Sequence, residues 1–258
     1  MNSFTELLDT YTPISLQEMD SIRLMNRTDT KFVLNADLLP LLLAKARPHY
    51  QVLEIKGNRD FPYHTTYLDT NEYKFFYEHM SCRPGRYKVR YRSYEATGCT
   101  FLEVKLKNRV NRTVKWRINR NNNNDLPSDS ELEFLKHHVQ QTACCLHPVL
   151  ENHFRRITLA GLKTNERITI DYDLSFCSPE GNEKKLPFIT IVELKREGYS
   201  GYSPITEILK SFQIHPTGFS KYCIGSVLVR NMDKKNLLKS KLLLINKLQN
   251  ESTQYSIA

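Results

Sequence analysis

Basic and apolar residues alternate strictly between positions 86 and 92. Every second residue in this stretch is a cation, and the residues between are apolar: Arg86, Lys88, Arg90 and Arg92 alternate with Tyr87, Val89 and Tyr91. Successive side chains of a β-strand point to opposite faces of the sheet. The segment is therefore predicted to be a strand with a row of cations on one face and a row of apolar side chains on the other.

The same alternation recurs in four other stretches. Their charged positions are Glu103, Lys105 and Lys107; Lys115 and Arg117; Arg167 and Asp171; and Glu193 and Lys195. Several strands thus direct charged rows to one shared space and apolar rows to a core. Because like charges on neighbouring strands repel each other, an arrangement dominated by cations indicates a polyanionic ligand.

Turn, capping and periodicity signals predict the remaining elements. Ser15 with Glu18, and Ser128 with Glu131, have the spacing of a capping box that begins a helix. Strands are expected at 26–34, 50–56, 61–69, 86–95, 100–107, 113–119, 149–159, 166–176 and 188–195. Helices are expected at 15–24, 37–46, 72–79, 128–140, 219–229 and 234–248. A further helix is expected to begin at 203, and a polar loop is expected at 121–124.

Two architectures fit antiparallel strands with charged alternate positions: a flat sheet with one hydrated face, or a closed barrel with a polar lumen. An eight-stranded barrel is just wide enough to hold one ligand. Desolvating an unpaired cation there would cost on the order of several kcal/mol, so such a lumen must hold water, carboxylates or an anion. No repeat or linker divides the chain, and we predict one domain over 1–258, with a core at 23–230 and a peripheral basic helix or tail at 231–258.

The composition restricts the classes of partner. A net charge of +9 over 258 residues favours nucleic acid, phosphate compounds or a membrane surface. No apolar run reaches the roughly 18 residues of a spanning helix, and the N-terminus lacks a secretory signal pattern. The six cysteines include no CxxC pair and the eight histidines no ligand spacing. We therefore expect reduced thiols, no zinc site, no role for histidine and a cytoplasmic protein, with a peripheral location at the cytoplasmic membrane face as a second placement.

Seven short motifs occur in a fixed order along the chain. They are RTDTKF at 27–32, YLDT at 67–70, KVRYR at 88–92, FLEVK at 101–105, RITID at 167–171, VELK at 192–195 and FSKY at 219–222. Together they resemble the VTC domain, the polyphosphate polymerase module of the triphosphate tunnel metalloenzyme superfamily. The resemblance covers about 23–230, which is nearly the whole chain.

This resemblance implies an α+β fold, an eight-stranded antiparallel β-barrel tunnel with flanking helices. It implies ATP-dependent extension of inorganic polyphosphate with Mn²⁺ or Mg²⁺ as the divalent metal. The catalytic residues that it indicates are Lys31, Arg90, Arg92, Lys105, Arg167 and Lys221. Substrate and phosphate contacts are expected from Arg27, Lys88, Lys107, Arg155, Arg156, Lys195 and Ser220, with the choice between Arg155 and Arg156 left open by the alternation. Glu193 is the expected metal ligand, with help from Glu103.

Two features bear on competing functions. Relatives can carry another lysine where this chain has Thr217 and Gly218, which points to weaker polymer binding. Hydrolases of the superfamily, which cleave tripolyphosphate or nucleoside triphosphates, begin with alternating glutamates, whereas this chain has Arg27, Asp29 and Lys31. Fewer carboxylates favour gripping a polyanion over activating water, so a triphosphatase is the first alternative and a non-catalytic polyphosphate-binding module is the second.

Two further partner classes follow from the residues and the resemblance. Nucleic acid is not expected, because the aromatic residues alternate onto the buried face and are not free to stack on bases. The resemblance is compatible with a membrane protein partner, and the basic tail at 234–247 is a candidate docking surface for it. The sequence carries no signal for an oligomeric state.

Overall fold

The computed structural model describes residues 4–21, 27–110, 112–120, 127–198 and 201–255. Eleven strands form one sheet. They are β1 (Pro13–Ile14), β2 (Arg27–Asn35), β3 (Tyr50–Leu53), β4 (Phe61–Asp69), β5 (Arg86–Tyr94), β6 (Cys99–Lys107), β7 (Thr113–Arg120), β8 (His147–Gly161), β9 (Glu166–Cys177), β10 (Glu183–Leu186) and β11 (Ile189–Glu197).

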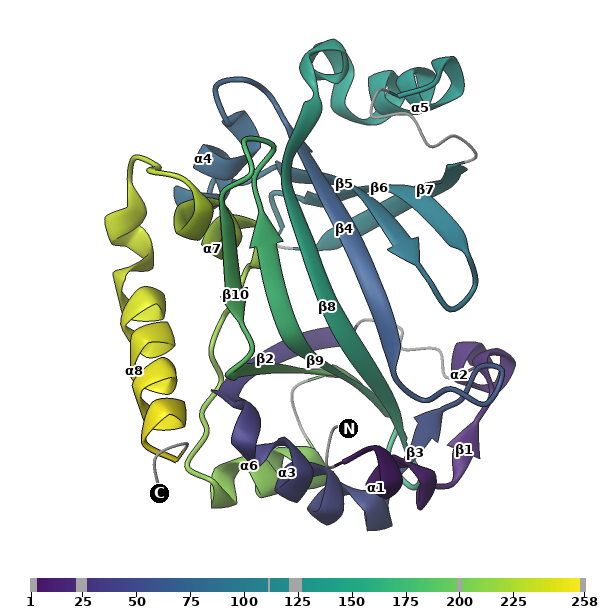
Figure 1. Ribbon diagram of the computed structural model, residues 1–258. Coiled ribbons are helices and arrows are strands. Elements are labelled where there is room, and N and C mark those ends of the chain that lie inside the picture. The colour runs from purple at the N-terminus through teal and green to yellow at the C-terminus, as the bar shows by residue number, and fades with distance from the viewer. Residues whose placement is uncertain (1–3, 22–26, 111, 121–126, 199–200, 256–258) are drawn as a thin grey trace.

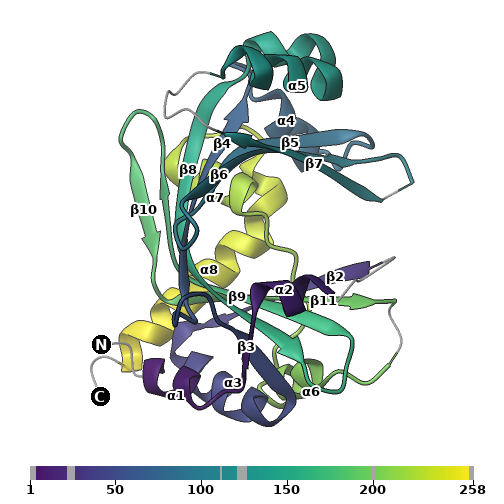
Figure 2. The same cartoon turned by 90° about the vertical axis from the view of Figure 1, so that its right-hand side faces the viewer.

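Eight of these strands make the main path of the sheet, in the order β2-β11-β9-β8-β4-β5-β6-β7, and every neighbouring pair is antiparallel. The path curls into a half-barrel (Figure 1), and in Figure 2 it bends from β5, β6 and β7 at the top to β2, β9 and β11 at the bottom. No ladder joins β2 to β7 within the described residues. The predicted α+β fold with eight antiparallel strands and flanking helices is confirmed, in the form of a curled half-barrel.

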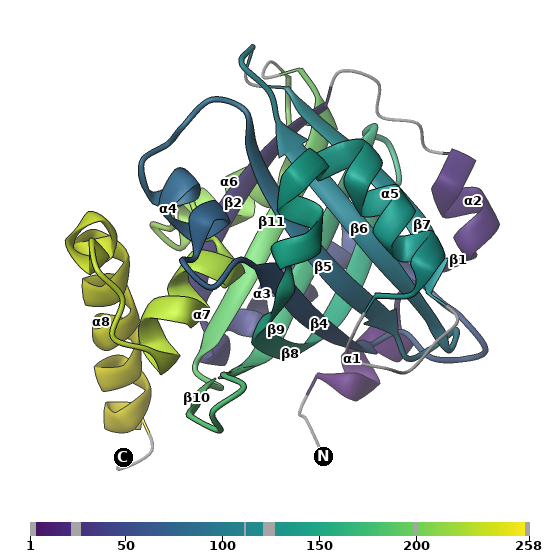
Figure 3. The ribbon, with the colours of Figure 1, turned by 90° about the horizontal axis from the view of Figure 1, so that it is seen from above.

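Most of the helices cover the convex side and the ends of the sheet, and α7 packs on the concave side. They are α1 (Thr5–Asp9), α2 (Leu16–Ser21), α3 (Leu39–Ala46), α4 (Lys74–Met80), α5 (Asp129–Val139), α6 (Pro204–Ser211), α7 (Lys221–Val229) and α8 (Lys239–Tyr255), with 3-10 turns at Ala36–Leu38, Arg47–His49, Gln140–Cys145 and Lys235–Leu238. Figure 3 shows α5 lying over β5, β6 and β7, where Leu135 and Val139 pack against Val89, Leu102 and Val104. At the other end of the path, α1, α3 and α6 cover the apolar rows of β2, β9 and β11.

One end of the concave side is apolar and is covered by α7. There α7 packs against β4, β8 and β9, and Tyr222 stacks on Tyr67 with ring centroids 5.0 Å apart. The helix comes so close to the sheet that a Cβ at Gly225 would lie 2.4 Å from the ring of Phe176. The helix α8 packs outside α7, and its residue Ile245 is buried in the same hydrophobic cluster as Tyr222. This end closes off the concavity and leaves the charged rows in the rest of it.

Local sequence signals account for most element boundaries. The Ser128 hydroxyl accepts from the Glu131 N–H while the Glu131 carboxylate accepts from the Ser128 N–H, so the predicted capping box is present. Ser15 and Glu18 form the same pair of contacts at the start of α2. Three predicted features lie outside the described residues. They are the end of the helix α2 at 24, the start of the first long strand at 26 and the polar loop at 121–124. Two short strands, β1 and β10, were not predicted, because two and four residues carry no readable period.

The C-terminal helix is longer than expected and begins later, at Lys239 instead of 234. It packs on the core through Ile245 and Leu248. None of the described helices is long and apolar enough to cross a membrane. The treatment of the chain as one domain stays a prediction.

Candidate functional site

Strand pairing places the charged rows side by side on the concave face. Across β5 and β6, Lys88 is opposite Lys105 and Arg90 is opposite Glu103. Across β11 and β2, Glu193 is opposite Lys31. Since residues paired in register point to the same side of a sheet, these groups share one surface with Arg92, Lys115, Arg156, Arg167, Asp171 and Lys195.

We call the part of this surface on β5, β6 and β7 the cationic wall; it comprises Lys88, Arg90, Arg92, Glu103, Lys105 and Lys115. Glu103 is its carboxylate and is 0% exposed. Arg90 contacts one Glu103 oxygen through Nη2 at 2.6 Å and Nε at 2.8 Å, and Lys115 forms an ion pair with the other. Burial disfavours the charged carboxylate, but Arg90, Arg92 and Lys115 together outweigh it and hold the pKa of Glu103 below its ordinary value.

Three cations of this wall have no carboxylate of their own among the described residues. Arg92 donates to the Thr65 hydroxyl at 3.3 Å, and Lys88 donates to the Ser220 hydroxyl at 3.1 Å. The Arg90 charge, followed by burial, lowers the pKa of Lys105 well below its ordinary value. Burial is the main cause that lowers the pKa of Lys88 to about 8. Depressed lysine pKa values mean that the charged forms are disfavoured here, and an added anion would relieve that cost.

The opposite part of the surface, which we call the paired wall, lies on β2, β8, β9 and β11 and comprises Lys31, Arg156, Asp171, Glu193 and Lys195. Asp171 accepts from Arg156 at 2.5 and 2.8 Å in a two-pronged contact. Glu193 contacts Lys195 at 2.8 Å and Lys31 at 3.6 Å. Burial disfavours both carboxylates, yet Arg156 beside Asp171 and Lys195 beside Glu193 keep both pKa values below the ordinary range.

The N-terminus of α7 lies between the two walls. Ser220 is its N-cap and accepts from the Cys223 N–H at 3.2 Å, in addition to the Lys88 ammonium. Lys221 forms an ion pair with Asp171, and burial lowers its pKa to about 7 in spite of that partner. Lys31 donates to the Phe219 carbonyl at 3.3 Å. The helix start therefore contacts cations of both walls.

Asp69, at the end of β4, holds this helix in place. Its carboxylate accepts from the N–H groups of Thr70, Phe75 and Phe76 at 2.8–2.9 Å, and from the Tyr222 hydroxyl. It is a buried cap for α4 and a support for α7. Burial raises its pKa.

The structure resolves the choice between the two neighbouring arginines. Arg156 faces the concave side, where it binds Asp171, whereas Arg155 points to the convex side and contacts Asp60 at 2.7 Å and the Tyr172 hydroxyl at 3.2 Å. The register of β8 against β4 sets this orientation, because it runs unbroken from the Phe61–Arg156 pair to the His64–His153 pair. Arg155 is therefore remote from the other expected phosphate contacts.

Other expected residues lie at the margins of the surface. Arg27 is exposed at the start of β2, where it contacts Asp29 at 3.2 Å. Lys107 is at the far end of β6, opposite Arg86. Arg167 donates to the Met19 carbonyl of α2. The structure thus brings Lys31, Lys88, Arg90, Arg92, Lys105, Arg156, Lys195, Ser220 and Lys221 together with Glu103, Asp171 and Glu193, and places Arg27, Lys107 and Arg167 toward the edges.

The two expected metal ligands differ in how well they suit a cation. Both oxygens of Glu103 contact buried cations, so a metal would have to displace Arg90 or Lys115. Glu193 is partly exposed to the concavity, and one of its oxygens has only the long contact to Lys31. A single carboxylate oxygen suits Mg²⁺ or Mn²⁺ when phosphate oxygens supply the other positions. Glu193 fits this requirement and Glu103 does not.

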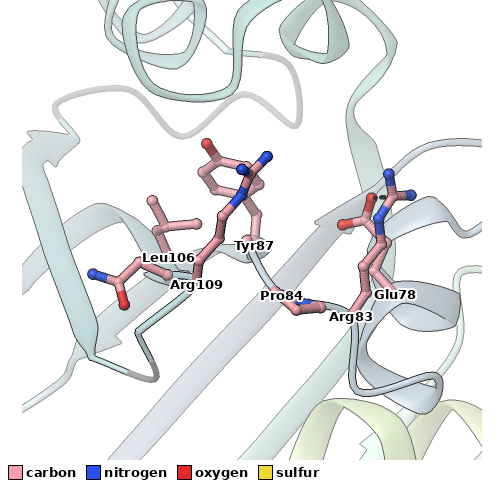
Figure 4. Close-up of a pocket in the computed structure, with 8 residues that line it drawn as sticks. Glu78, Arg83, Pro84, Tyr87, Leu106 and Arg109 are labelled. Carbon is pink, nitrogen blue, oxygen red and sulfur yellow. Dashed lines mark ion pairs between the residues drawn. The ribbon is translucent and has the colours of Figure 1, made fainter.

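Sequence reasoning did not assign a role to Lys115. Its alternation with Val114 and Trp116 was the available signal. A pocket of about 360 Å³ was also not foreseen. Figure 4 shows Arg83 and Arg109 on its two sides, with Tyr87 between them. Tyr87 alternates with the cations of β5, so the pocket lies on the convex side and is separate from the charged surface.

We compared the chain with known proteins in three ways. In a search of solved structures, a proposed adenylate cyclase from Bacillus halodurans is similar over 76% of this chain and 96% of its own, with 14% identity and a TM-score of 0.48. A proposed adenylyl cyclase from Hippeastrum, described as having a dominant triphosphatase activity, covers 82% of this chain and 99% of its own, with 11% identity and a TM-score of 0.47. No curated protein sequence matches the chain. The family model of the VTC domain matches residues 26–230, and the chain therefore belongs to the VTC domain family.

Proposed function

We propose that this protein is an ATP-dependent polyphosphate polymerase that transfers the terminal phosphate of ATP to a growing polyphosphate chain. The observation that carries the proposal is the excess of cations on the cationic wall, where the one carboxylate of Glu103 is set against buried Arg90 and Arg92, partly buried Lys88 and Lys105, and exposed Lys115. A long polyanion with many equivalent oxygens is the ligand that best compensates such a row.

The two kinds of cation suit different tasks. Guanidinium groups bind two phosphate oxygens at once in a fixed plane, which is the role we assign to Arg90 and Arg92. Lysine ammonium groups are compact charges that can follow a moving phosphate, which suits Lys105, Lys88 and Lys31. The start of α7 adds the Ser220 hydroxyl, backbone N–H groups and Lys221, which together suit a terminal phosphate.

The reaction asks for positioning and charge neutralisation more than for covalent help. A terminal oxygen of the polyphosphate chain forms a bond to the γ-phosphorus of ATP. The bond from that phosphorus to the β–γ bridging oxygen breaks, and ADP leaves with the electron pair. The attacking oxygen is already ionised, so no general base is required. Arg90, Arg92, Lys105 and Lys221 would stabilise the charge that develops on the transferred group.

A divalent cation completes the proposal. Glu193 would hold Mn²⁺ or Mg²⁺ together with phosphate oxygens, and the bound ion would neutralise charge on the phosphates. Glu103 keeps a structural role, in which it fixes the directions of Arg90 and Lys115.

The test is incubation of the purified protein with ATP, Mn²⁺ and a short polyphosphate primer. A ladder of growing chains on a gel, with ADP released in equal amount, is the expected result. Free phosphate with no ladder would replace the polymerase with a triphosphatase. If tripolyphosphate binds in calorimetry but no product forms, the protein is a binding module, or it needs a partner for activity.

Glu193→Gln separates catalysis from binding, because it removes the ligand for the metal and keeps the shape of the side chain. We expect turnover to fall by at least a hundredfold while tripolyphosphate still binds. Glu183→Gln on β10 is the matched control, since this glutamate is exposed and remote from the concave side. Unchanged turnover of Glu193→Gln would remove the metal assignment.

We further propose that the C-terminal helix docks on an anionic membrane surface. The helix exposes Leu243, and Lys239 and Lys247 lie on the same face, one turn before it and one turn after it. Flotation with vesicles containing an anionic lipid tests this surface, and replacement of the two lysines by glutamine should weaken the binding. If the wild-type protein does not float with such vesicles, the docking proposal fails.

A further inference from the structure

Two histidines and a glutamate meet on the convex side of the half-barrel, away from the charged concave surface. His64 belongs to β4, and Glu151 and His153 belong to β8, which is the neighbouring strand. His64 is paired in register with His153, and Glu151 is two residues before His153 and so on the same face. His64 alternates with Tyr63 and Thr65, and Thr65 contacts Arg92 on the concave side. The cluster therefore lies on the convex face of β4 and β8 and does not share the concave space.

The three side chains converge on one point. The Nε2 atom of His64 lies 3.3 Å from Glu151 Oε2, and the Nε2 atom of His153 lies 3.7 Å from the same oxygen. One ligand atom from each residue lies within 4.8 Å of the others, and among the described residues this is the one group of three or more potential ligands with such spacing. Zinc bonds of about 2.0–2.1 Å in a tetrahedral site put neighbouring ligand atoms roughly 3.3 Å apart. The two measured separations are close to that value.

A ring nitrogen of His64 is shielded from solvent at this point. Its Nε2 atom contacts Glu151 Oε2 at 3.3 Å, and this contact lacks hydrogen-bond geometry. A buried polar atom without a hydrogen bond is uncommon, and a missing ion is one of its ordinary explanations. The two imidazole rings lie parallel, with centroids 4.2 Å apart, so a tilt of the rings toward each other would direct both nitrogens at one ion.

The electrostatic setting favours the neutral imidazole that a metal needs. Burial and the neighbouring His153 lower the pKa of His64, while Glu151 and the more distant Glu95 oppose that shift. Neutral His64 keeps a lone pair on nitrogen at neutral pH. Glu151 and His153 are each about half exposed, so an ion can reach the cluster from solvent.

We propose that His64, Glu151 and His153 form a binding site for one transition-metal ion of the zinc class, with the remaining coordination positions taken by water. Two imidazoles and one carboxylate suit Zn²⁺, Co²⁺ or Ni²⁺, whereas the carboxylate and phosphate oxygens of the concave side suit Mg²⁺ or Mn²⁺. The site is thus distinct from the metal that the proposed polymerase uses. A bound ion would cross-link β4 to β8 next to the β-bulge that precedes Arg156.

Zinc titration by calorimetry tests the site, with protein that carries no histidine tag. Because the exposed and adjacent Cys144 and Cys145 can also bind zinc, the titration uses the Cys144→Ser/Cys145→Ser background. We expect one zinc ion per chain, and at least tenfold weaker binding after His64→Gln/His153→Gln. His137→Gln, an exposed histidine on α5, is the matched control and should bind zinc as the background does.

Two further readouts keep the outcome independent of folding. The single variant His153→Gln changes a half-exposed side chain, and its thermal unfolding without metal should match that of the background. Co²⁺ bound at the site should give visible absorption without the intense near-ultraviolet bands of thiolate ligation. The proposal fails if no zinc binds, if zinc binds equally well to the double variant, or if the cobalt spectrum shows thiolate ligands.

Discussion

The two walls of the concavity carry similar side chains but solve different electrostatic problems. On the paired wall, Asp171 is matched by Arg156 and Lys221, and Glu193 is matched by Lys195 and Lys31. On the cationic wall, Glu103 is matched by Arg90 and Lys115, while Arg92, Lys105 and Lys88 have no carboxylate partner among the described residues. The first wall sets four cations against two carboxylates and every one of them has a carboxylate contact, whereas the second sets five cations against one carboxylate.

This difference assigns different tasks to the walls. A wall whose cations all contact carboxylates holds its shape without ligand and offers the partly exposed carboxylate of Glu193 that a metal needs. A wall with surplus charge is stable only at the cost of depressed pKa values, and it gains most when a polyanion arrives. The fold tolerates that cost because apolar clusters under α5 and under α3 supply the stability.

The largest effect is expected when the cationic wall loses its carboxylate. Glu103→Gln leaves Arg90 and Lys115 with no counter-charge, and removing one partner of a buried ion pair costs about 3–5 kcal/mol. Urea unfolding should show a loss of this size. Tripolyphosphate should restore much of it, since the ligand replaces the missing charge. Equal loss with and without tripolyphosphate would mean that the wall does not bind polyanions.

A pair of lysine substitutions compares the two walls directly. Lys105→Met removes a cation without a carboxylate partner, so we expect an unliganded protein at least as stable as the wild type and tripolyphosphate binding about a hundredfold weaker. Lys195→Met removes a partner of Glu193 and should lower stability, because the buried carboxylate loses its closest counter-charge. Calorimetry and urea unfolding measure both quantities. The same sign of stability change in both variants would contradict the distinction between the walls.

A smaller effect is expected at the helix that links the walls. Gly225→Ala places a methyl group 2.4 Å from the Phe176 ring and 2.9 Å from Leu150, and overpacking of this kind costs roughly 1–3 kcal/mol. The displaced α7 should also move Ser220 and Lys221 and reduce turnover. Gly181→Ala is not a suitable control. The backbone at Gly181 has a φ of 88°, and a residue with a side chain adopts that angle only with strain. Ala143→Gly is the control, because it changes one methyl group in the core under α5, away from α7. It tests whether a core substitution that does not touch α7 also reduces turnover.

The period of the charged residues made most of the fold and the concave surface predictable. The alternation over 86–92 and 101–107 directly specifies which side chains share a face, and strand pairing carries that face from one segment to the next. The capping boxes at Ser128 and Ser15 were equally local. Each of these signals lies within a few residues of the sequence.

What could not be predicted depends on contacts between distant segments. The choice of Arg156 over Arg155 depends on the register of β8 against β4, which places Arg156 opposite Phe61 and which the sequence of either strand alone does not specify. The meeting of His64 with Glu151 and His153 depends on strand register between segments almost ninety residues apart in the chain. Glu103 has a structural role and Glu193 is free to bind a metal because different cations reach their oxygens. The spacing of residues in the sequence does not specify those contacts.

The smallest effect we expect is a dependence of polyanion affinity on pH, and it tests the start of α7, where cations of both walls meet. Lys221 and Lys88 have pKa values of about 7 and about 8 in the free protein, so both lose charge as the pH rises from 6.5 to 9. Tripolyphosphate favours their charged forms. Binding should therefore take up protons near pH 7.5, and the affinity should weaken several-fold over this range.

The stability of the free protein changes in the opposite direction. The lysines of the unfolded chain keep their protons up to a higher pH than those of the folded protein, so the free energy of unfolding rises with pH through this window. Calorimetry in two buffers with different ionisation enthalpies measures the uptake, and Lys221→Gln serves as the reference that accounts for titration of the ligand itself. If the wild type and Lys221→Gln take up the same number of protons, the buried ammonium at the start of α7 does not contact the bound anion.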